Sequence, residues 1–287
     1  MADSTLADPT FADSTMAEED PGPFRLYALR YATREAVRQD HFMAEVDDPG
    51  RAMAMDYFVW LATDGRTHVL IDTGFNEQVA AARGRMWLHR PADCVQAVGV
   101  DPAEIRHVVL THLHYDHAGT LEDFPGATFH LQDREYQFAT GRGSDSTRAG
   151  FEAADMTRLV DLYYQGRLVL QDGSASPVPG LSMHLVGGHT PGLQVVSVRT
   201  ERGRVVLMSD ASHFYEHFER GLSFPHADDP KRSIASFALI DELADSREHV
   251  VPGHDPLVLA RYPAVPNQPG LAAAALHRPP AEEPQCH

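Results

Sequence analysis

Four residues of the types that bind metal ions lie within six positions of one another near the middle of the chain. An apolar segment, expected to form a strand over residues 107–110, is followed by His112, His114, Asp116 and His117. In an extended chain, side chains two residues apart point the same way, so His112 and His114 can reach one ion. Imidazole and carboxylate suit Zn²⁺, with Mn²⁺, Fe²⁺ and Co²⁺ as competitors. The segment therefore predicts a metal site directly after a strand.

Three further segments place a histidine or an aspartate just beyond an apolar run. These candidate ligands are His189, Asp210 and His254. Glycines stand beside the two histidines, and glycine permits a tight turn and a close approach of the backbone. In α/β sheets, ligands collect outside the carboxyl ends of the strands. We therefore predict that these loops and the 112–117 segment meet at one edge of the fold.

The combined pattern resembles the metallo-β-lactamase superfamily, whose signature is an H-x-H-x-D-H run followed by a His, an Asp and a His at strand ends. The resemblance covers residues 57–255, most of the part expected to fold. It implies an α/β fold of the four-layer αβ/βα sandwich type. Two mixed sheets would then carry helices on their outer sides and a dinuclear metal site between them.

The resemblance also implies a role for each candidate ligand. One metal ion would be held by His112, His114 and His189. The other would be held by Asp116, His117 and His254, with Asp210 bridging both ions. Asp72, in the run Ile-Asp-Thr-Gly, would support a ligand from outside the metal shell, because outer carboxylates hold imidazoles in the right tautomer.

A pair of divalent ions predicts hydrolysis of an ester-like bond. Such ions lower the pKa of a bridging water, polarise a carbonyl and stabilise the leaving oxygen. The expected reaction is attack by a metal-bridging hydroxide, which needs no Ser or Cys nucleophile. Asp116 is the expected proton carrier, because it could contact both an ion and the product. Two Zn²⁺ are the expected cofactors, and Mn, Fe or Co are possible.

Differences between branches of the superfamily indicate which branch this chain resembles most. The di-iron redox branch resembles H-x-E-x-D-H, so the histidine at position 114 argues against redox chemistry. Secreted β-lactamases carry an export signal and often a Cys in the second site, whereas Asp210 stands at the bridging position here. Little chain follows His254, and Lys231 is the one lysine, which argues against glutathione thioesterases. The chain most resembles the lactonase branch, N-acyl homoserine lactonases and 4-pyridoxolactonase.

The expected substrate is a small lactone, an N-acyl homoserine lactone of the quorum-quenching type. One alternative substrate is a heteroaromatic lactone, as in 4-pyridoxolactonase. Another is a thioester or a phosphodiester, hydrolysed by an enzyme of the same fold. A metal-binding scaffold protein is the alternative that is not an enzyme. Apolar side chains are expected to line an acyl or aromatic pocket: Phe42, Met43, Met53, Met55, Met86, Trp87, Phe214 and Phe218.

Position 213 departs from the lactonase pattern. Homoserine lactonases often carry a Tyr three residues after the bridging Asp, where its hydroxyl helps to polarise the substrate carbonyl; this chain has His213 there. An imidazole can donate a similar hydrogen bond and Tyr215 is close in sequence, so both are catalytic candidates. His213 and His217 are also spaced as a helical pair, for which an exposed face is expected. Asp255 either orients a ligand or caps a turn.

Short apolar runs alternate with helical patterns between the two ends of the chain, as in layered α/β domains. Expected strands cover residues 24–31, 57–62, 68–71, 107–110, 128–131, 168–170, 183–186, 194–198, 205–208 and 249–251. Expected helices cover residues 76–83, 133–139 and 230–244. The last has Asp229 as a plausible N-cap and Pro230 at its first position. Hairpin-like neighbours among so many strands favour two sheets.

Composition sets the limits of the folded part and of its partners. Residues 1–23 repeat a five-residue unit with six acidic residues, which predicts an acidic tail or arm; residues 24–268 are the expected metallo-hydrolase domain and 269–287 a C-terminal tail. A net charge of −17 argues against nucleic acid as a partner. No apolar run spans a membrane, and Cys94 and Cys286 indicate no disulfide framework, so we expect a soluble, cytoplasmic protein. A homodimer is possible by analogy with lactonases.

Overall fold

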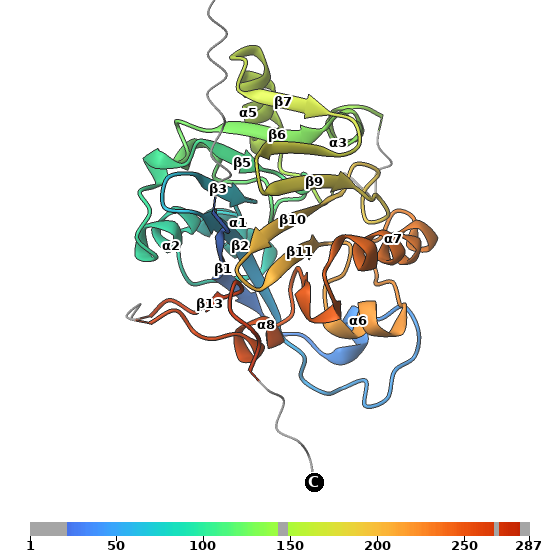
Figure 1. The fold of residues 1–287 in the computed structure, drawn as a ribbon. Helices are drawn as coiled ribbons and strands as arrows, with labels where there is room; N and C mark the ends of the chain where they lie inside the picture. The colour runs from blue at the N-terminus through green and yellow to red at the C-terminus, as the bar shows by residue number, and fades with distance from the viewer. Residues whose placement is uncertain (1–21, 143–148, 267–269, 282–287) are drawn as a thin grey trace, which may run out of the picture.

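The computed structural model describes residues 22–142, 149–266 and 270–281, and its strands form two sheets (Figure 1). The larger sheet has the order β13-β1-β2-β3-β5-β6-β7, with β4 paired to β1. Its strands are β1 (Arg25–Arg34), β2 (Met55–Thr63), β3 (His68–Ile71), β4 (Met86–Trp87), β5 (His107–Val109), β6 (Thr128–Gln132), β7 (Leu168–Gln171) and β13 (Ala273–Ala275). Strands β3, β5, β6 and β7 run parallel, and β1 pairs antiparallel with both of its neighbours.

The smaller sheet has the order β12-β11-β10-β9-β8. Its strands are β8 (Ala175–Val178), β9 (Leu181–Leu185), β10 (Gln194–Thr200), β11 (Gly203–Ser209) and β12 (Val250–Pro252). Only the pair β11 and β12 is parallel within it, so both sheets are mixed. Parallel neighbours need a long connection, and the chain between β11 and β12 includes two helices.

Alternation along β2 explains why the two sheets stack with helices outside them. Every residue of β2 is buried, so this strand has apolar side chains on both faces. Phe58 and Trp60 point into the core between the sheets, with Met183 and Val196 of the smaller sheet. Their neighbours on the opposite face, among them Val59, pack in the core beneath the helices of the first sheet. A strand that buries both faces must be covered on both sides.

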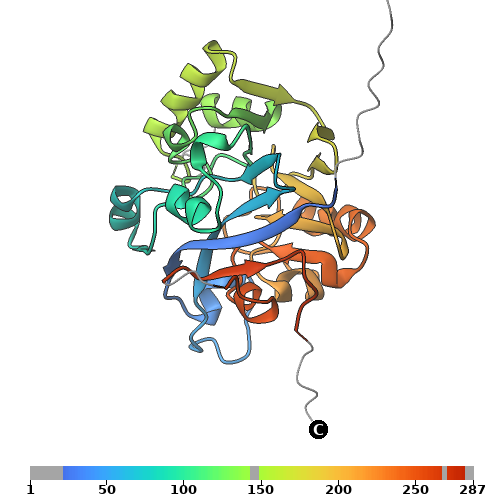
Figure 2. The same cartoon turned by 60° about the vertical axis from the view of Figure 1, so that its left-hand side comes forward.

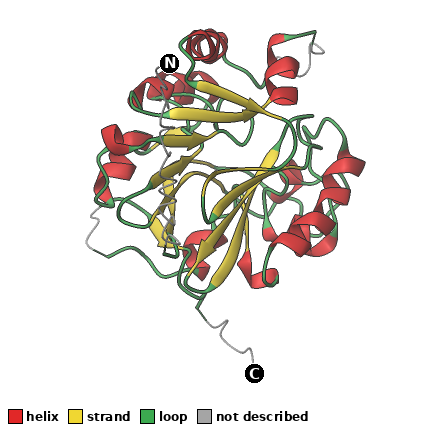
Figure 3. Cartoon of the chain, turned by 45° about the horizontal axis from the view of Figure 1, so that its top comes forward, coloured by secondary structure: helices red, strands yellow, loops and turns green. Residues whose placement is uncertain are grey.

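Helices supply the outer layers (Figure 3). They are α1 (Glu77–Arg83), α2 (Pro91–Ala97), α3 (Asp133–Thr140), α5 (Ala153–Tyr164), α6 (Tyr215–Arg220), α7 (Pro230–Leu243) and α8 (Leu257–Arg261). Short 3₁₀ turns are η1 (Arg38–His41), η2 (Pro102–Glu104), η3 (Leu121–Asp123) and η4 (Arg247–His249). Apolar residues of α2 and α5 pack on the larger sheet, and those of α7 pack on the smaller one. The predicted four-layer αβ/βα sandwich is confirmed.

Sequence patterns located most of these elements, with definite exceptions. As predicted, α7 begins with Pro230, and its N-cap Asp229 accepts hydrogen bonds from the next turn. Helices α2, α5, α6 and α8 and strand β8 were not expected. Except for α5, which has 12 residues, these elements are short, so their formation depends on the surface on which they pack.

The prediction of a tail from residue 269 is wrong for residues 273–277. Strand β13 pairs with β1 and lies beside it in Figure 2, with Ala274 and Leu276 fully buried. Three alanines carry no strand propensity, so the free edge of β1 decides their conformation. The acidic repeat at residues 1–21 and the last residues, 282–287, lie outside the described part of the chain.

Within the described ranges, none of the helices has the length and hydropathy that crossing a membrane requires.

Candidate metal centre

The loop after β5 carries four of the predicted ligands. Strand β5 lies in parallel register between β3 and β6, and its carboxyl end continues into this loop. Gly119 allows the loop to pack against the end of β3, because its N–H donates to the Gly74 carbonyl at 2.8 Å. A Cβ at position 119 would lie only 2.6 Å from that oxygen. Packing of the two loops leaves His112 with no exposed surface and His117 with 1%.

Three other loops bring the remaining predicted ligands to the same place. His189 follows β9, Asp210 follows β11 and His254 follows β12. The ligand atoms form groups of three whose members all lie within 4.8 Å of one another. These groups are His112, His114 and His189; Asp116, His117 and His254; and His112, His117 and Asp210. All seven predicted ligands therefore gather at the carboxyl ends of strands from both sheets.

Asp210 stands between the two groups of histidines. Its Oδ1 lies 3.0 Å from Nε2 of His254 and 3.3 Å from Nε2 of His117. Its Oδ2 lies 3.2 Å from Nε2 of His189, on the side of the other group. Nε2 of that histidine is 2.7 Å from Nδ1 of His114. One carboxylate therefore presents one oxygen to each half of the site.

Three of the histidines are held in the neutral form that divalent cations need, whereas in His117 burial lowers the pKa but Asp210, Asp116 and Asp72 raise it by more. Burial lowers the pKa of His114 to about 4, and burial also lowers the pKa values of His112 and His189. Neutral imidazoles with free lone pairs are the form that binds a metal ion. Nε2 of His117 is buried and makes no aligned hydrogen bond to a described residue, and its charged neighbour is Oδ1 of Asp210 at 3.3 Å. Such an atom is costly to bury unless something binds it.

Asp72 holds the His117 ring from behind. Its Oδ2 lies 2.7 Å from Nδ1 of His117, which directs the opposite nitrogen into the site. Asp72 also accepts hydrogen bonds from the Thr111 N–H and hydroxyl. Burial raises the pKa of this carboxyl, and the nearby His117 opposes the rise. The contact agrees with the outer position that the resemblance implied for Asp72.

Glu135, which the sequence did not indicate, joins two of the ligand loops. This fully buried carboxylate of α3 accepts hydrogen bonds from the Leu113 N–H at 3.1 Å and the Thr190 hydroxyl at 2.6 Å. It also accepts from the N–H of Gly192, where a Cβ would collide with the Glu135 backbone. Nothing in the sequence of α3 marked Glu135 as a partner of the ligand loops.

His213 lies in the site, beside Asp210. Its Nε2 is 3.0 Å from Oδ2 of Asp210, and its ring stacks on Phe224 at a centroid distance of 3.6 Å. Burial lowers the pKa of His213 to about 3, so the ring is neutral. His189, Asp210 and His213 also form a group that could hold a metal ion. His213 thus borders the candidate metal ligands through Asp210.

Tyr215, in contrast, faces away from the site, and its prediction as a catalytic residue is wrong. It begins α6, packs in the core between the sheets and lies under the Arg261 guanidinium at 4.0 Å. His213 precedes α6 and its N-cap Phe214, whereas Tyr215 is the first residue of the helix and packs into the core. Asp255 caps this turn by accepting from the Tyr215 N–H.

The predicted exposed face for His213 and His217 is also wrong. His217 is fully buried, and its Nε2 lies 3.0 Å from the backbone oxygen of His41. The two imidazole rings are 6.3 Å apart and belong to no common ligand group among the described residues. His217 therefore anchors η1 to α6.

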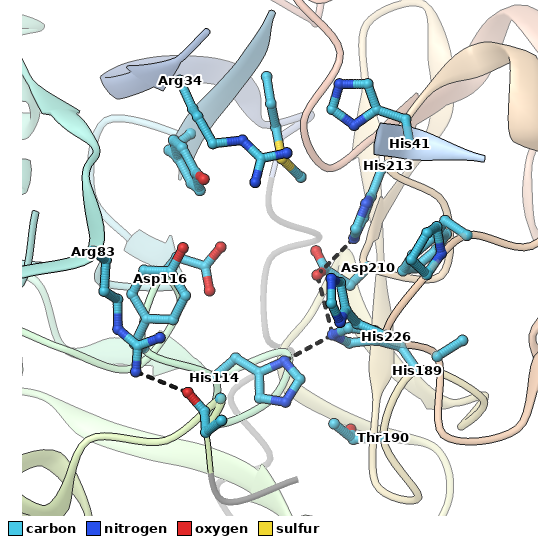
Figure 4. Close-up of a pocket in the computed structure, with 18 of the residues that line it drawn as sticks. Arg34, His41, Arg83, His114, Asp116, His189, Thr190, Asp210, His213 and His226 are labelled. Carbon is cyan, nitrogen blue, oxygen red and sulfur yellow. Dashed lines mark hydrogen bonds and ion pairs between the residues drawn. The ribbon is translucent and has the colours of Figure 1, made fainter. Parts of the chain in front are cut away.

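A cavity of about 730 Å³ opens over the gathered ligands (Figure 4). His114, Asp116, His189, Asp210 and His213 form part of its wall. Of the apolar residues expected to line it, only Met55 does so within the described part of the chain. Other walls come from aromatic and charged residues that the sequence did not single out: Arg34, Tyr57, Arg83, Arg85, Tyr115, Phe138 and Phe224.

Sequence comparison relates the chain to lactone-opening enzymes. Residues 54–254 match the metallo-beta-lactamase superfamily. N-acyl homoserine lactonase AttM of Azorhizobium caulinodans is 29% identical over 272 residues, which cover 86% of this chain and 97% of that protein. N-acyl homoserine lactonase AiiA of Bacillus thuringiensis subsp. kurstaki is 26% identical over 223 residues, or 72% of this chain and 84% of AiiA.

Solved structures share the fold. A quorum-quenching N-acyl homoserine lactone lactonase superimposes with a TM-score of 0.70 at 24% identity, covering 83% of this chain and 95% of that one. AidC, a dizinc quorum-quenching lactonase, superimposes with a TM-score of 0.65 at 19% identity, covering 88% and 94%. The matched span 54–254 includes all seven gathered ligands. The chain belongs to the metallo-beta-lactamase superfamily.

Proposed function

We propose that this protein is a metal-dependent hydrolase that opens the ring of a small lactone, with N-acyl homoserine lactones as the substrate class. The observation that carries the proposal is the position of Asp210, one oxygen of which faces each half of a buried site rich in histidine. The activity named for AttM and AiiA, the relatives described above, supports the choice of substrate.

The metal ions would be held by seven side chains. His112, His114 and His189 would bind one ion; Asp116, His117 and His254 would bind the other; and Asp210 would bridge them. Two Zn²⁺ suit this set, with Mn, Fe or Co as possible replacements. When bound, such ions supply an activated water, a polarised carbonyl and stabilisation of the leaving oxygen.

Asp116 is the proposed proton carrier. Ring opening requires that a proton pass from the attacking water to the ring oxygen that leaves. The Asp116 carboxylate lies in the cavity wall, with Oδ2 3.7 Å from Nε2 of His117 and 3.9 Å from Nε2 of His254. An acid–base group must lie at the reacting bond. Asp116 and Asp210 are both ligand carboxylates in the cavity wall, and Asp210 is the proposed bridge, so Asp116 is assigned the proton transfer.

His213 is proposed to orient the substrate carbonyl. A neutral imidazole carries one N–H, and Nε2 is the ring nitrogen that faces the site beside Asp210. Stacking on Phe224 fixes the plane of the ring, so an N–H at this atom is already oriented. It would donate to the carbonyl oxygen of the lactone.

The test is hydrolysis by zinc-loaded protein of N-acyl homoserine lactones with acyl chains of different length, followed by chromatography of the ring-opened acids. We expect ring opening that is lost in Asp210→Asn and after removal of metal. A panel of 4-pyridoxolactone, a glutathione thioester and bis-nitrophenyl phosphate examines the alternatives. Faster turnover of any of these than of every homoserine lactone would overturn the proposed substrate class. No turnover of any compound by metal-loaded protein would support the scaffold alternative.

A further inference from the structure

Three arginines line the cavity of a protein whose net charge is −17. Arg34 ends β1, Arg83 ends α1, and Arg85 lies just before β4. Figure 4 shows the Arg34 guanidinium directed into the cavity, from the side opposite His114 in that view. A homoserine lactone with a plain hydrocarbon chain is uncharged and provides no partner for these cations.

The three arginines differ in the hydrogen bonds and ion pairs that they make with other residues of the protein. Arg83 pairs with Glu152 at 2.7 Å and lies over the Tyr115 ring. Arg85 donates to the Tyr115 hydroxyl at 3.0 Å and to the backbone oxygen of Arg83 at 2.7 Å. Arg34 has a buried Nε without a hydrogen-bond partner, and within the described ranges its guanidinium makes no salt bridge. Arg34 is therefore the cation that still needs a partner.

Four acidic residues line the cavity, Asp40, Asp116, Asp210 and Asp228, and none of them forms an ion pair with Arg34 in the described part of the chain. Asp116 and Asp210 face the imidazoles of the proposed metal site. Asp40 accepts a hydrogen bond from the Val37 backbone, within η1 and its N-cap. The Arg34 side chain is half-buried, and its guanidinium faces the cavity without an ion pair among the described residues (Figure 4). Metal ions at the site would add further positive charge.

Arg34 and Arg85 share the cavity wall with Tyr57 and Asp116. Tyr57 lines the cavity, and burial raises the pKa of its hydroxyl. Asp116 adds to that rise and both guanidiniums oppose it, so the charges of Asp116, Arg34 and Arg85 all act on this phenol. An anion that binds there would be attracted by both arginines at once.

We propose that the natural substrate is a lactone bearing a carboxylate, which Arg34 binds while the lactone ring lies at the metal site. This inference rests on the proposed lactonase function and narrows it to anionic substrates. The planar fork of a guanidinium matches a carboxylate through two parallel hydrogen bonds. A cavity of about 730 Å³ is within the range of small-molecule sites and has room for a ring and a short chain.

Three homoserine lactones of equal chain length form the activity test: N-adipoyl, its methyl ester and N-hexanoyl. We expect kcat/KM for the adipoyl compound to exceed that for the ester by about tenfold or more, the scale of a charge-assisted hydrogen bond. Arg34→Gln should lower this acid-to-ester ratio of kcat/KM to about one, and Arg34→Lys should leave it between one and the wild-type value. Arg66→Gln removes an exposed arginine in the turn between β2 and β3 and should keep the wild-type ratio.

Binding gives a readout that does not depend on turnover. The γ-lactam analogues of the adipoyl compound and of its methyl ester lack the scissile ester, and calorimetry measures their affinity for wild type and for Arg34→Gln. Tighter binding of the carboxylate to wild type alone is the expected result. Equal affinity or equal kcat/KM for acid and ester overturns the proposal while the lactonase function stands. Preferential binding of the acid without hydrolysis of any lactone would instead contradict the lactonase function.

Discussion

The carboxylate of Glu135 lies 2.6 Å from the Thr190 hydroxyl, and this contact fastens α3 to the loop that carries His189. The other oxygen of the same carboxylate accepts from the Leu113 N–H, between His112 and His114. One buried side chain thus sets the distance between two ligand loops that are separated by more than seventy residues. Its position in the molecule suggests the first of four predictions.

Replacing Glu135 by Ala should weaken both the fold and metal binding. The change leaves three buried donors without an acceptor, for which we expect a loss of about 3 kcal/mol in the free energy of unfolding. Zinc affinity should fall by about tenfold or more, because outer contacts position the ligands. Urea denaturation and zinc titration measure the two effects. Glu122→Ala, at an exposed site, is the control, and equal behaviour of the two variants would refute the role of Glu135.

Replacing Asp72 by Asn should loosen one half of the metal site. Asp72 has a φ of 60°, which asparagine tolerates, so the backbone is preserved. Loss of the charge behind His117 should lower the affinity of the second ion by about ten- to a hundredfold, while one ion per chain remains tightly bound. Competition with a chelator, together with metal counting, tests this expectation. Loss of both ions in parallel would show that Asp72 supports the whole site.

His213→Ala should reduce turnover far more than metal content. The proposed donor to the substrate carbonyl is removed, but the seven proposed ligands stay in place, so two ions should remain. A decrease of about a hundredfold in kcat is the scale of losing one such donor. Metal analysis and kinetics on the same preparation decide the point. A loss of zinc that matches the loss of rate would identify His213 as a ligand.

The pH dependence of stability should include a contribution from His130, away from the metal site. Burial, with a smaller effect of His107, lowers the pKa of His130 from its usual 6.5 to about 4. The unfolded chain therefore binds this proton first, and stability is lost as the pH falls from 6.5 towards 4, by at most about 3 kcal/mol. In metal-free protein, His130→Gln should flatten this decline in urea denaturation. His226→Gln, at an exposed histidine, should retain the wild-type decline.

Much of the site could be predicted because its determinants are local. The run from His112 to His117 follows one strand, and His189, Asp210 and His254 each follow another. Their positions after strands are enough to predict that these side chains meet at one edge of the fold. Tyr215 was misjudged because closeness in sequence does not reveal direction: α6 turns it into the core. Strand β13 was missed because its alanines have no preference that reveals a strand.

The amino-acid order is enough to establish the layered α/β class, the ligand types and their places after strands, since alternation and spacing act over a few residues. Only the folded chain decides that Glu135 joins two ligand loops and that Arg34 faces the cavity with no ion pair to a described residue (Figure 4). Burial and charge pairing arise from segments that meet in space but lie far apart along the chain. Such contacts leave no periodic mark in the sequence.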